Sequence, residues 1–303
     1  MQSVTIQSYH RLYEAVEKPL LYAAPWWLDA TCGTSGWEAV IRNREDGSVI
    51  AALPFHTTRI RGLSALITPP LTQWVSLISS AHNHEISHQS LLPLLPKSAI
   101  LDLSVKPETE LLDQHTSLPM ILKYSFIIPG MESMEVVRRS YNEGLKRNLR
   151  QAEKNYTLEE SDDIEGFISL CEQSYLQRKM KSPQWLHKVV RNVYQQLIHH
   201  QCGAITVATF QGKVIAGILT AWDQHSCYYL AGGRTPDDQG ASAHALLLDR
   251  AVQAAQSMGI AFDFEGSMHP GIANFFQSFG GVPVSYWQIR KFTGIGKLWS
   301  LFH

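Results

Sequence analysis

The residues best suited to proton transfer follow an apolar run near the carboxyl end of the chain. The strand-like run Ala261–Phe264 is followed by Glu265, Ser267 and His269. A carboxylate or an imidazole at this place could accept a proton from an attacking amine, provided that its surroundings bring its pKa near neutrality. The alternative is a turn in which the carboxylate caps a loop and the histidine simply precedes Pro270.

Tyr286 completes the candidates for proton transfer. It lies on the expected last strand, Val282–Phe292, where a hydroxyl could protonate a leaving group or belong to the core. The sequence contains no G-x-S-x-G nucleophile motif, no Walker loop and no H-E-x-x-H pair. Covalent hydrolase and zinc-protease chemistry is therefore disfavoured.

A glycine-rich turn offers a different chemistry. The expected strand Ser226–Ala231 runs into Gly232 and Gly233, and Gly240 lies just before the expected helix Ser242–Met258. Backbone N–H groups at a helix N-terminus suit the phosphates of a cofactor. Turns of this composition also occur for purely geometric reasons, so the sequence leaves both interpretations open.

Positive charges recur along a helical pattern in the middle of the chain. Lys146, Arg150 and Lys154 are spaced four residues apart, and Arg147 lies beside them. This spacing places the three on one helical face, which could bind a phosphate-bearing substrate. A solvated face partnered by nearby glutamates explains the same pattern.

The one local group of histidines consists of His82, His84 and His88. The last two lie one helical turn apart, a spacing compatible with zinc. Only Glu85 adds a nearby ligand, and no cysteine does. We interpret these histidines as solvated and expect no metal.

Composition limits the class of protein. With 303 residues, 45% hydrophobic and 17% charged, the chain is long enough for two globular domains. A net charge of −1 supplies no general attraction for nucleic acid. The N-terminus lacks the pattern of a signal peptide, and no apolar run reaches membrane-spanning length. Four well-separated cysteines fit free thiols, so we expect a cytoplasmic protein.

The elements that would position these residues include a repeated hairpin signal. Gly47–Leu53 and Gly212–Ile218 share a glycine turn followed by β-branched residues and a small buried residue. The repeat indicates a duplicated domain, although two hairpins can share a few residues by chance. Pro129 and Gly130 close the first half.

The second half reads as a hairpin, then strand, loop, helix and strand, which favours a mixed α/β sheet. Ligands of such sheets gather at the carboxyl ends of neighbouring strands. We therefore expect Gly232 and Glu265 at the same edge. The second hairpin is followed by this chemistry, whereas the first runs into Pro69 and Pro70, so we expect the second copy to bind the donor and the first to supply a wall of the acceptor groove.

Several motifs from about residue 134 to 292 together resemble the GNAT acyltransferase superfamily, and more closely its branch of Fem peptidoglycan-bridge aminoacyltransferases and BioF-like acetyltransferase domains. The matching segments, in order, are Leu145–Lys154, Tyr175–Arg178, Val214–Gly217, Tyr228–Gly232, Phe262–Ser267 and Phe275–Gly281.

The resemblance implies tandem GNAT-like domains, each a mixed, mostly antiparallel sheet flanked by helices. The expected boundaries are 1–132 for a degenerate first domain, 133–292 for the second, and 293–303 for a tail that packs on the first. A splayed strand pair would hold the donor carbonyl, with backbone donors on Cys227–Ala231 stabilising the oxyanion.

The resemblance also assigns roles to residues. Glu265, His269 and Tyr286 would act in proton transfer. The acyl-coenzyme A donor would contact Tyr228, Tyr229, Gly232, Gly233, Gly240 and Ser242. An anionic acceptor would contact Arg147, Arg150, Arg178, Arg234 and Ser267. Asp237 departs from the family pattern, because it stands where the phosphate loop has a basic or amide residue.

The expected function is N-acyl transfer, such as acetyl transfer, from a thioester to an amine of a sugar, amino acid or peptide precursor. One alternative is a Fem-type enzyme that uses aminoacyl-tRNA, although the long helical arm of many Fem enzymes is missing. Another is an inert binding module that kept the groove and lost the donor site. The tail could touch a membrane-borne acceptor, but we expect no stable membrane insertion.

Overall fold

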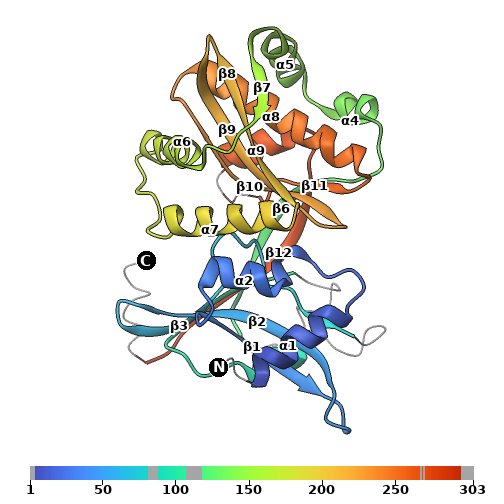
Figure 1. The fold of residues 1–303 in the computed structure, drawn as a ribbon, viewed down its shortest axis with the longest axis vertical. Coiled ribbons are helices and arrows are strands. Elements are labelled where there is room, and N and C mark those ends of the chain that lie inside the picture. Colours follow the sequence, from blue (N-terminus) through green and yellow to red (C-terminus); the bar gives the residue numbers. More distant parts are fainter. Residues whose placement is uncertain (1–3, 81–87, 107–117, 267, 269, 295–303) are drawn as a thin grey trace. The chain divides into compact units, whose positions relative to one another are not determined.

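The computed structural model describes residues 4–80, 88–106, 118–266, 268 and 270–294 (Figure 1). The chain divides into two compact units. The first consists of Met1–Lys123 and Ser285–His303, and the second of Tyr124–Val284.

The first unit carries short helices beside a mixed sheet. Its helical segments are α1 (Val4–Ala15), η1 (Leu21–Ala23), α2 (Pro25–Cys32), α3 (His88–Leu91) and η2 (Leu92–Leu94). Its strands are β1 (Trp37–Asn43), β2 (Val49–Ile60), β3 (Leu63–Ile67), β4 (Ile78–Ser79) and β5 (Ile100–Val105). The main sheet runs β1-β2-β3-β5-β12, where β12 is Val282–Phe292, and β3 and β5 are parallel.

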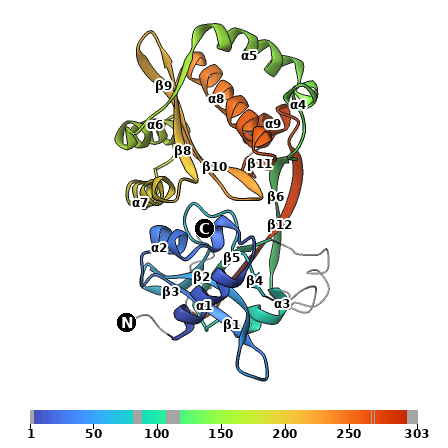
Figure 2. The same ribbon diagram turned by 45° about the vertical axis from the view of Figure 1, so that its right-hand side comes forward.

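The second unit has helices on both faces of its sheet. Its helices are α4 (Met134–Ser140), α5 (Glu143–Asn155), α6 (Ile164–Gln177), α7 (Leu186–His199), α8 (Asp238–Ser257) and α9 (Pro270–Ser278). Its strands are β7 (Thr157–Glu160), β8 (Gly203–Phe210), β9 (Lys213–Trp222), β10 (Ser226–Arg234) and β11 (Ala261–Asp263). The sheet runs β6-β11-β10-β9-β8-β7, where β6 is Met120–Ile128, and β10 and β11 are parallel. Figure 2 shows α6 and α7 on one face and α8 with α5 on the other.

Two strands pass between the units along the chain. Strand β6 (Met120–Ile128) follows the first unit but pairs with β11 of the second, and β12 (Val282–Phe292) follows the second unit but pairs with β5 of the first. The two units thus exchange their last strands. For this reason the compact units divide after Lys123 and Val284 rather than at the expected positions 132 and 292.

Both hairpin signals form hairpins. Gly212 has a positive φ of 75° and follows Gln211 at 50° in a two-residue turn between β8 and β9. The β1–β2 turn is longer, and Gly47 at φ 83° donates its N–H to Arg44 O. Glycine supplies these left-handed conformations without the steric cost that a side chain adds.

Side-chain caps set the starts of the helices around the second sheet. Asn142 accepts a hydrogen bond from the Leu145 N–H at the start of α5, and Asp237 accepts one from the Gly240 N–H at the start of α8. Leu145, Leu149 and Ala152 then form the buried face of α5. Because Asp237 caps α8, the helix expected from residue 242 begins at residue 238.

The described part of the chain adds three further observations. The four cysteines are free thiols. No described helix is long and apolar enough to cross a bilayer. No group of three or more His, Cys, Asp or Glu suited to a metal is found in the residues described; His82, His84 and Glu85 of the histidine group lie outside them.

Candidate active site

The centre of the candidate site is the place where β10 and β11 part. The two parallel strands pair only from Ser226–Ala261 to Tyr228–Asp263. Beyond that point no described backbone hydrogen bond joins them, and β10 is irregular against β9 between Tyr229 and Ala231. A bulge next to an open strand pair exposes backbone donors to a bound group.

The equivalent parallel pair of the first unit is closed. Pairing of β3 with β5 ends at Ile67–Asp102, but the Thr68 N–H then donates to Asp102 O at 3.0 Å. The Thr68 hydroxyl accepts from the Ser104 N–H at 2.7 Å, and the Val75 N–H donates to Ser104 O at 2.8 Å. The segment after β3 thus returns to β5 and fills the place that stays open in the second unit.

Glu265 lies at the end of β11. Its Oε1 atom is buried and has no hydrogen-bond partner among the described residues. Burial raises the pKa of this carboxyl group well above its usual range. Its backbone is held in the left-handed region at φ 58°, and its N–H donates to Asp263 Oδ1 at 2.8 Å. A carboxyl group that has a raised pKa, and whose buried Oε1 has no described partner, is suited to accept a proton once it is ionised.

Asp263 fixes this turn. Its side chain is buried, with 1% of its surface exposed, and it also accepts a hydrogen bond from the Ser125 hydroxyl of β6. Gly266 follows at φ 60°, where a Cβ atom would lie 2.2 Å from Tyr124 O. The exchanged strand β6 therefore holds the segment that carries Glu265 by both a hydrogen bond and close backbone packing.

A tyrosine–histidine pair lies on the β10 side. The Tyr229 hydroxyl lies 3.0 Å from Nε2 of His244 on α8. His244 stacks on Phe275, and Tyr229 contacts the edge of Phe276. Burial, with help from Arg234 and Arg178, lowers the pKa of His244 to about 4, while burial raises the pKa of Tyr229. Both groups are therefore neutral at pH 7.

The two adjacent glycines of β10 are required for packing rather than for the turn. A Cβ atom on Gly232 would lie 2.2 Å from the Tyr229 hydroxyl oxygen and 2.8 Å from His244 Nε2. A Cβ atom on Gly233 would lie 2.2 Å from the Leu170 carbonyl carbon of α6. Both glycines are strand residues, which corrects their expected place in a loop.

Hydrogen bonds between residues of the loop from β10 to α8 hold its conformation. Asp237 Oδ1 accepts from the Thr235 hydroxyl at 2.9 Å and from the Gly240 N–H at 2.7 Å. These hydrogen bonds lower the pKa of Asp237. The Arg234 guanidinium donates to Thr235 O at 3.1 Å and to Asp237 O at 3.3 Å. The Gly240 N–H is thus already used within the protein, whereas Arg234 places a positive charge on this loop. Ser242 lies one turn further along α8.

The predicted residues also include Tyr228, Tyr286, Ser267 and His269. Tyr228 is buried, and its hydroxyl donates to Asp223 Oδ2 at 2.9 Å, toward the start of β10. Tyr286 belongs to the first unit, where it packs on Trp74 at 5.6 Å between ring centroids. Ser267 and His269 are not among the described residues.

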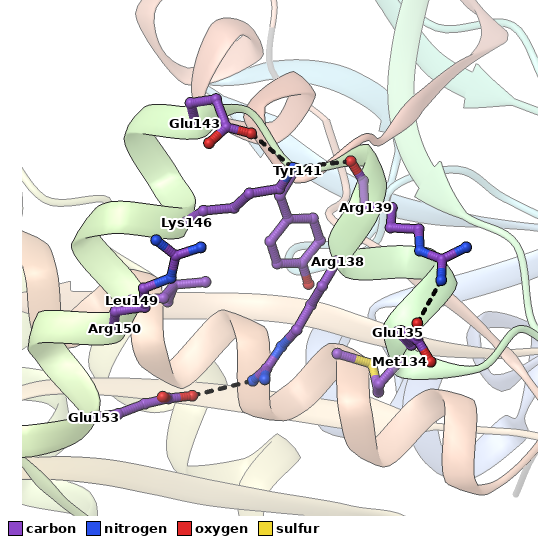
Figure 3. A pocket seen from close by; sticks show the side chains of 10 residues that line it. All are labelled: Met134, Glu135, Arg138, Arg139, Tyr141, Glu143, Lys146, Leu149, Arg150 and Glu153. Carbon is purple, nitrogen blue, oxygen red and sulfur yellow. Dashed lines mark hydrogen bonds and ion pairs between the residues drawn. The ribbon is translucent and has the colours of Figure 1, made fainter.

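The predicted acceptor arginines do not form one group. Arg178 ends α6 and lies close enough to affect the pKa of Tyr229 and His244. Arg150 instead lines a cavity of about 600 Å³ formed by α4 and α5, and Arg147 is exposed on α5 outside its lining (Figure 3).

Most charges of the α4–α5 cavity are neutralised within it. Figure 3 shows Arg138 beside Glu153, at 3.3 Å, and Lys146 beside Glu143, at 2.9 Å. Arg138 also pairs with Asp249, whose side chain is fully buried. Arg150 is in none of the ion pairs found among the described residues. As far as the described residues show, the cavity is a structural ion-pair network in which Arg150 has no ion-pair partner.

Sequence reasoning missed His244. The available signal was a histidine in the second turn of a helix that follows a glycine-rich strand end, where α8 packs against β10. Nothing in the sequence alone pairs it with Tyr229, because the two are brought together only by the bulge at Leu230 and the absence of a side chain at Gly232.

The sequence of the second unit decides the family. Residues 137–274 match the family described as acetyltransferase (GNAT) domain. The second unit contains a GNAT domain. The match runs from α4 to α9 and includes the parted strands, Glu265 and the Tyr229–His244 pair. The sequence matches none of the curated proteins with which it was compared.

Solved structures place the GNAT domain within a larger shared fold. FemX is 13% identical to this chain, with a TM-score of 0.65 over 99% of the chain and 98% of FemX. L-PGS from Bacillus licheniformis is 11% identical, with a TM-score of 0.55 over 98% of this chain and 95% of its own. A tandem GNAT protein from the clavulanic acid biosynthesis pathway is 11% identical, with a TM-score of 0.50 over 94% of each chain.

At sequence identities this low, the similarity to these solved structures shows only a common fold. The family match confirms the resemblance of the second unit to the GNAT superfamily, and the likeness to FemX and to the tandem GNAT protein confirms the expected α/β fold with tandem GNAT-like domains, a fold shared with the Fem-like branch. The two units repeat one strand order, and each contains one parallel pair of strands. This repeat is the structural basis of the tandem arrangement.

Proposed function

We propose that the GNAT domain transfers an acyl group from a thioester donor to an amine of a sugar, amino acid or peptide precursor. The observation that supports this most is the parting of β10 and β11 beyond Tyr228 and Asp263, with the buried carboxyl group of Glu265 at the open end. Such an opening admits the donor carbonyl alongside backbone N–H groups of β10, which can stabilise an oxyanion.

The proposed reaction balances as a direct transfer. The amine nitrogen attacks the thioester carbon, and the electron pair of the carbonyl moves onto oxygen beside the β10 bulge. The Glu265 carboxylate takes the proton lost by the amine, and the C–S bond then breaks to release the thiolate. The raised pKa of Glu265 makes its carboxylate a stronger base than an exposed glutamate.

Tyr229 contacts the donor in this proposal. In the tautomer in which His244 Nε2–H donates to its oxygen, the neutral Tyr229 hydroxyl keeps its own hydrogen to donate to the carbonyl oxygen or the leaving sulfur. The surrounding Phe275 and Phe276 rings limit water at this position. A fixed hydrogen-bond donor that is shielded from water stabilises developing charge more than a solvated donor does, because the local dielectric constant is low.

The carrier of the acyl group is contacted by Arg234 rather than by Gly240 in this proposal. The Gly240 N–H already donates to Asp237, so the N-terminus of α8 offers a phosphate less than an uncapped helix would. Arg234 lies over the same loop with donors to spare, since a guanidinium carries five N–H bonds.

The second candidate is transfer of an aminoacyl group from charged tRNA. It is favoured by the capped start of α8 and by the fold shared with FemX along almost the whole chain. Binding that weakens steeply with salt would accompany this activity, because phosphate contacts release counterions.

The test supplies purified protein with acetyl-coenzyme A or with charged tRNA, each with glucosamine, free amino acids and short peptides. Mass spectrometry then detects the acylated amine. We expect product with the thioester. Product only with charged tRNA would replace the proposal by the second candidate, and no product from either donor, with no donor binding at millimolar concentration, would leave an inert binding module.

A further inference from the structure

The last residues of α6 and the turn that follows combine exposed apolar side chains with cations. Leu176 is 72% exposed and Met180 is 53% exposed. Arg178, Lys179 and Lys181 are interleaved with them and are also exposed. We call residues 176–181 the basic turn. Figure 1 shows it at the start of the connection from α6 to α7, at one side of the second unit.

Nothing nearby in the sequence neutralises this charge. No aspartate or glutamate occurs between Glu172 and Asp223, a stretch that also contains Lys188, Arg191 and Lys213. Glu172 pairs with His187 and Arg191 pairs with Glu165. Within the described residues, no ion pair includes Arg178, Lys179 or Lys181. The basic turn therefore keeps its full positive charge.

The backbone of the basic turn is well defined. The Lys179 N–H donates to Leu176 O at 2.9 Å, and the Met180 N–H donates to Tyr175 O at 3.0 Å. This pair of hydrogen bonds ends a helix with a left-handed residue, and Lys179 has that conformation at φ 56°. Glycine is the usual residue there. Lys179 adopts this conformation despite its steric cost. The cationic side chains of the basic turn are exposed.

The basic turn is fixed to the candidate active site. The Gln177 side chain donates to Arg234 O at 2.9 Å, and the Arg234 N–H donates to the Ser174 hydroxyl at 3.0 Å. These two bonds join the end of α6 to the end of β10. Whatever binds the basic turn is therefore held next to Arg234 at the end of β10, six residues beyond the last β10–β11 pair at Tyr228.

We propose that the basic turn docks the protein on an anionic lipid surface. Leu176 and Met180 would enter the interface while Arg178, Lys179 and Lys181 meet lipid phosphates, which gives the two signals that reversible membrane binding requires. A protein partner fits less well, because a stable interface buries roughly 800 Å² on each side and six residues of a projecting turn supply little of that. Nucleic acid would use the cations but not exposed leucine and methionine.

Docking has a consequence for the substrate that rests on the proposed function. The end of β10 would lie at the lipid interface, so the amine acceptor or the acyl donor would be carried by a lipid. The docking itself does not depend on that function, since vesicle binding is measured without any reaction.

Sedimentation with vesicles tests the docking on the full chain. We expect binding to vesicles of phosphatidylcholine with 30% phosphatidylglycerol, and much weaker binding to phosphatidylcholine alone. Lys179→Gln with Lys181→Gln should weaken binding by roughly 10- to 30-fold, at about fivefold for each lysine. Leu176→Ser with Met180→Ser should weaken it several-fold. These residues are exposed, and thermal unfolding checks that each variant remains folded.

Lys188→Gln with Lys213→Gln is the matched control, because it removes the same charge outside the basic turn and should change binding less than twofold. An equal loss in the control would overturn the proposal in favour of diffuse attraction. Absence of vesicle binding would also overturn it. So would binding to unfractionated tRNA that is lost in the lysine variant and kept in the Leu176 and Met180 variant.

Discussion

The Tyr229 hydroxyl lies 3.0 Å from Nε2 of His244, and the two residues reach each other from β10 and α8 across the space that Gly232 leaves empty. The hydrogen bond joins two neutral groups beside the point where β10 and β11 part. Its consequences for pH dependence and packing can be measured without knowledge of the substrate.

The buried imidazole should make the protein sensitive to acid. Burial lowers the pKa of His244 to about 4 from 6.5, so between these values the unfolded chain binds a proton that the folded chain does not. The free energy of unfolding should therefore fall by about 3 kcal/mol as the pH drops from 6.5 to 4. Urea unfolding at several pH values measures this loss.

His244→Gln should remove most of that loss, since an amide does not titrate. Tyr229→Phe is the control, because it deletes the hydrogen bond and leaves the imidazole buried. If the acid sensitivity of the His244→Gln protein equals that of the unchanged protein, the neutral, buried state of His244 is wrong.

Glu265 should lower the free energy of unfolding as the pH rises, which is the opposite of the effect of His244. Its pKa is raised in the folded protein, so above pH 4.5 the folded chain holds a proton that the unfolded chain has lost. Stability should decrease as the pH rises toward the raised pKa, by about 1.4 kcal/mol for each pH unit. Glu265→Gln should therefore become progressively more stable than the unchanged protein between pH 5 and pH 8, as followed by urea unfolding.

Glu160→Gln controls for loss of an exposed carboxylate, since Glu160 lies on β7 at the surface. A stability difference between Glu265→Gln and the unchanged protein that stays constant with pH would contradict the raised pKa of the Glu265 carboxyl group.

Gly232→Ala should disrupt the Tyr229–His244 pair. The new Cβ atom would meet both partners at 2.2 and 2.8 Å, so at least one side chain must move. We expect a cost of about 1–3 kcal/mol from overpacking. Gly144→Ala is the matched control, because its Cβ atom meets only Asn142 Oδ1 at 3.5 Å near the start of α5 and alanine favours helices. Thermal unfolding compares the two, and equal midpoints would refute the packing role of Gly232.

The ion pair between Arg138 and Asp249 should matter for stability. Asp249 is fully buried, so Arg138→Met leaves its charge without a partner. We expect a loss of about 3 kcal/mol in the free energy of unfolding. Adding Asp249→Asn removes the stranded charge and should restore most of the loss. A double variant no more stable than Arg138→Met would show that the guanidinium acts through packing alone.

The sequence predicted the parts of the fold that depend on local pattern. Both glycine turns are found, because positive φ values leave direct traces in residue types. The exchange of β6 and β12 leaves no such trace, since a strand reads the same whichever sheet it joins. The expected domain boundaries therefore differ from those of the compact units.

The candidate site was predictable only in part. Glu265 was indicated by its place after a strand, and the structure adds its burial and its lack of a partner. Tyr228 and Tyr229 are adjacent in sequence and looked equivalent, but the alternation of side chains sends one toward Asp223 and the other toward His244. Asp237 suggested a lost phosphate site, whereas its role as a helix cap depends on a hydrogen bond to Gly240.

The most direct test of acyl transfer at the parted strands is amine-dependent thiol release from acetyl-coenzyme A, measured from pH 5 to pH 9 for the unchanged protein and Glu265→Gln. The account predicts release that rises with pH as Glu265 ionises, and a rate lower by about 10²- to 10⁴-fold in the variant. Glu160→Gln should behave as the unchanged protein. An unaltered rate and pH profile in Glu265→Gln would contradict the account.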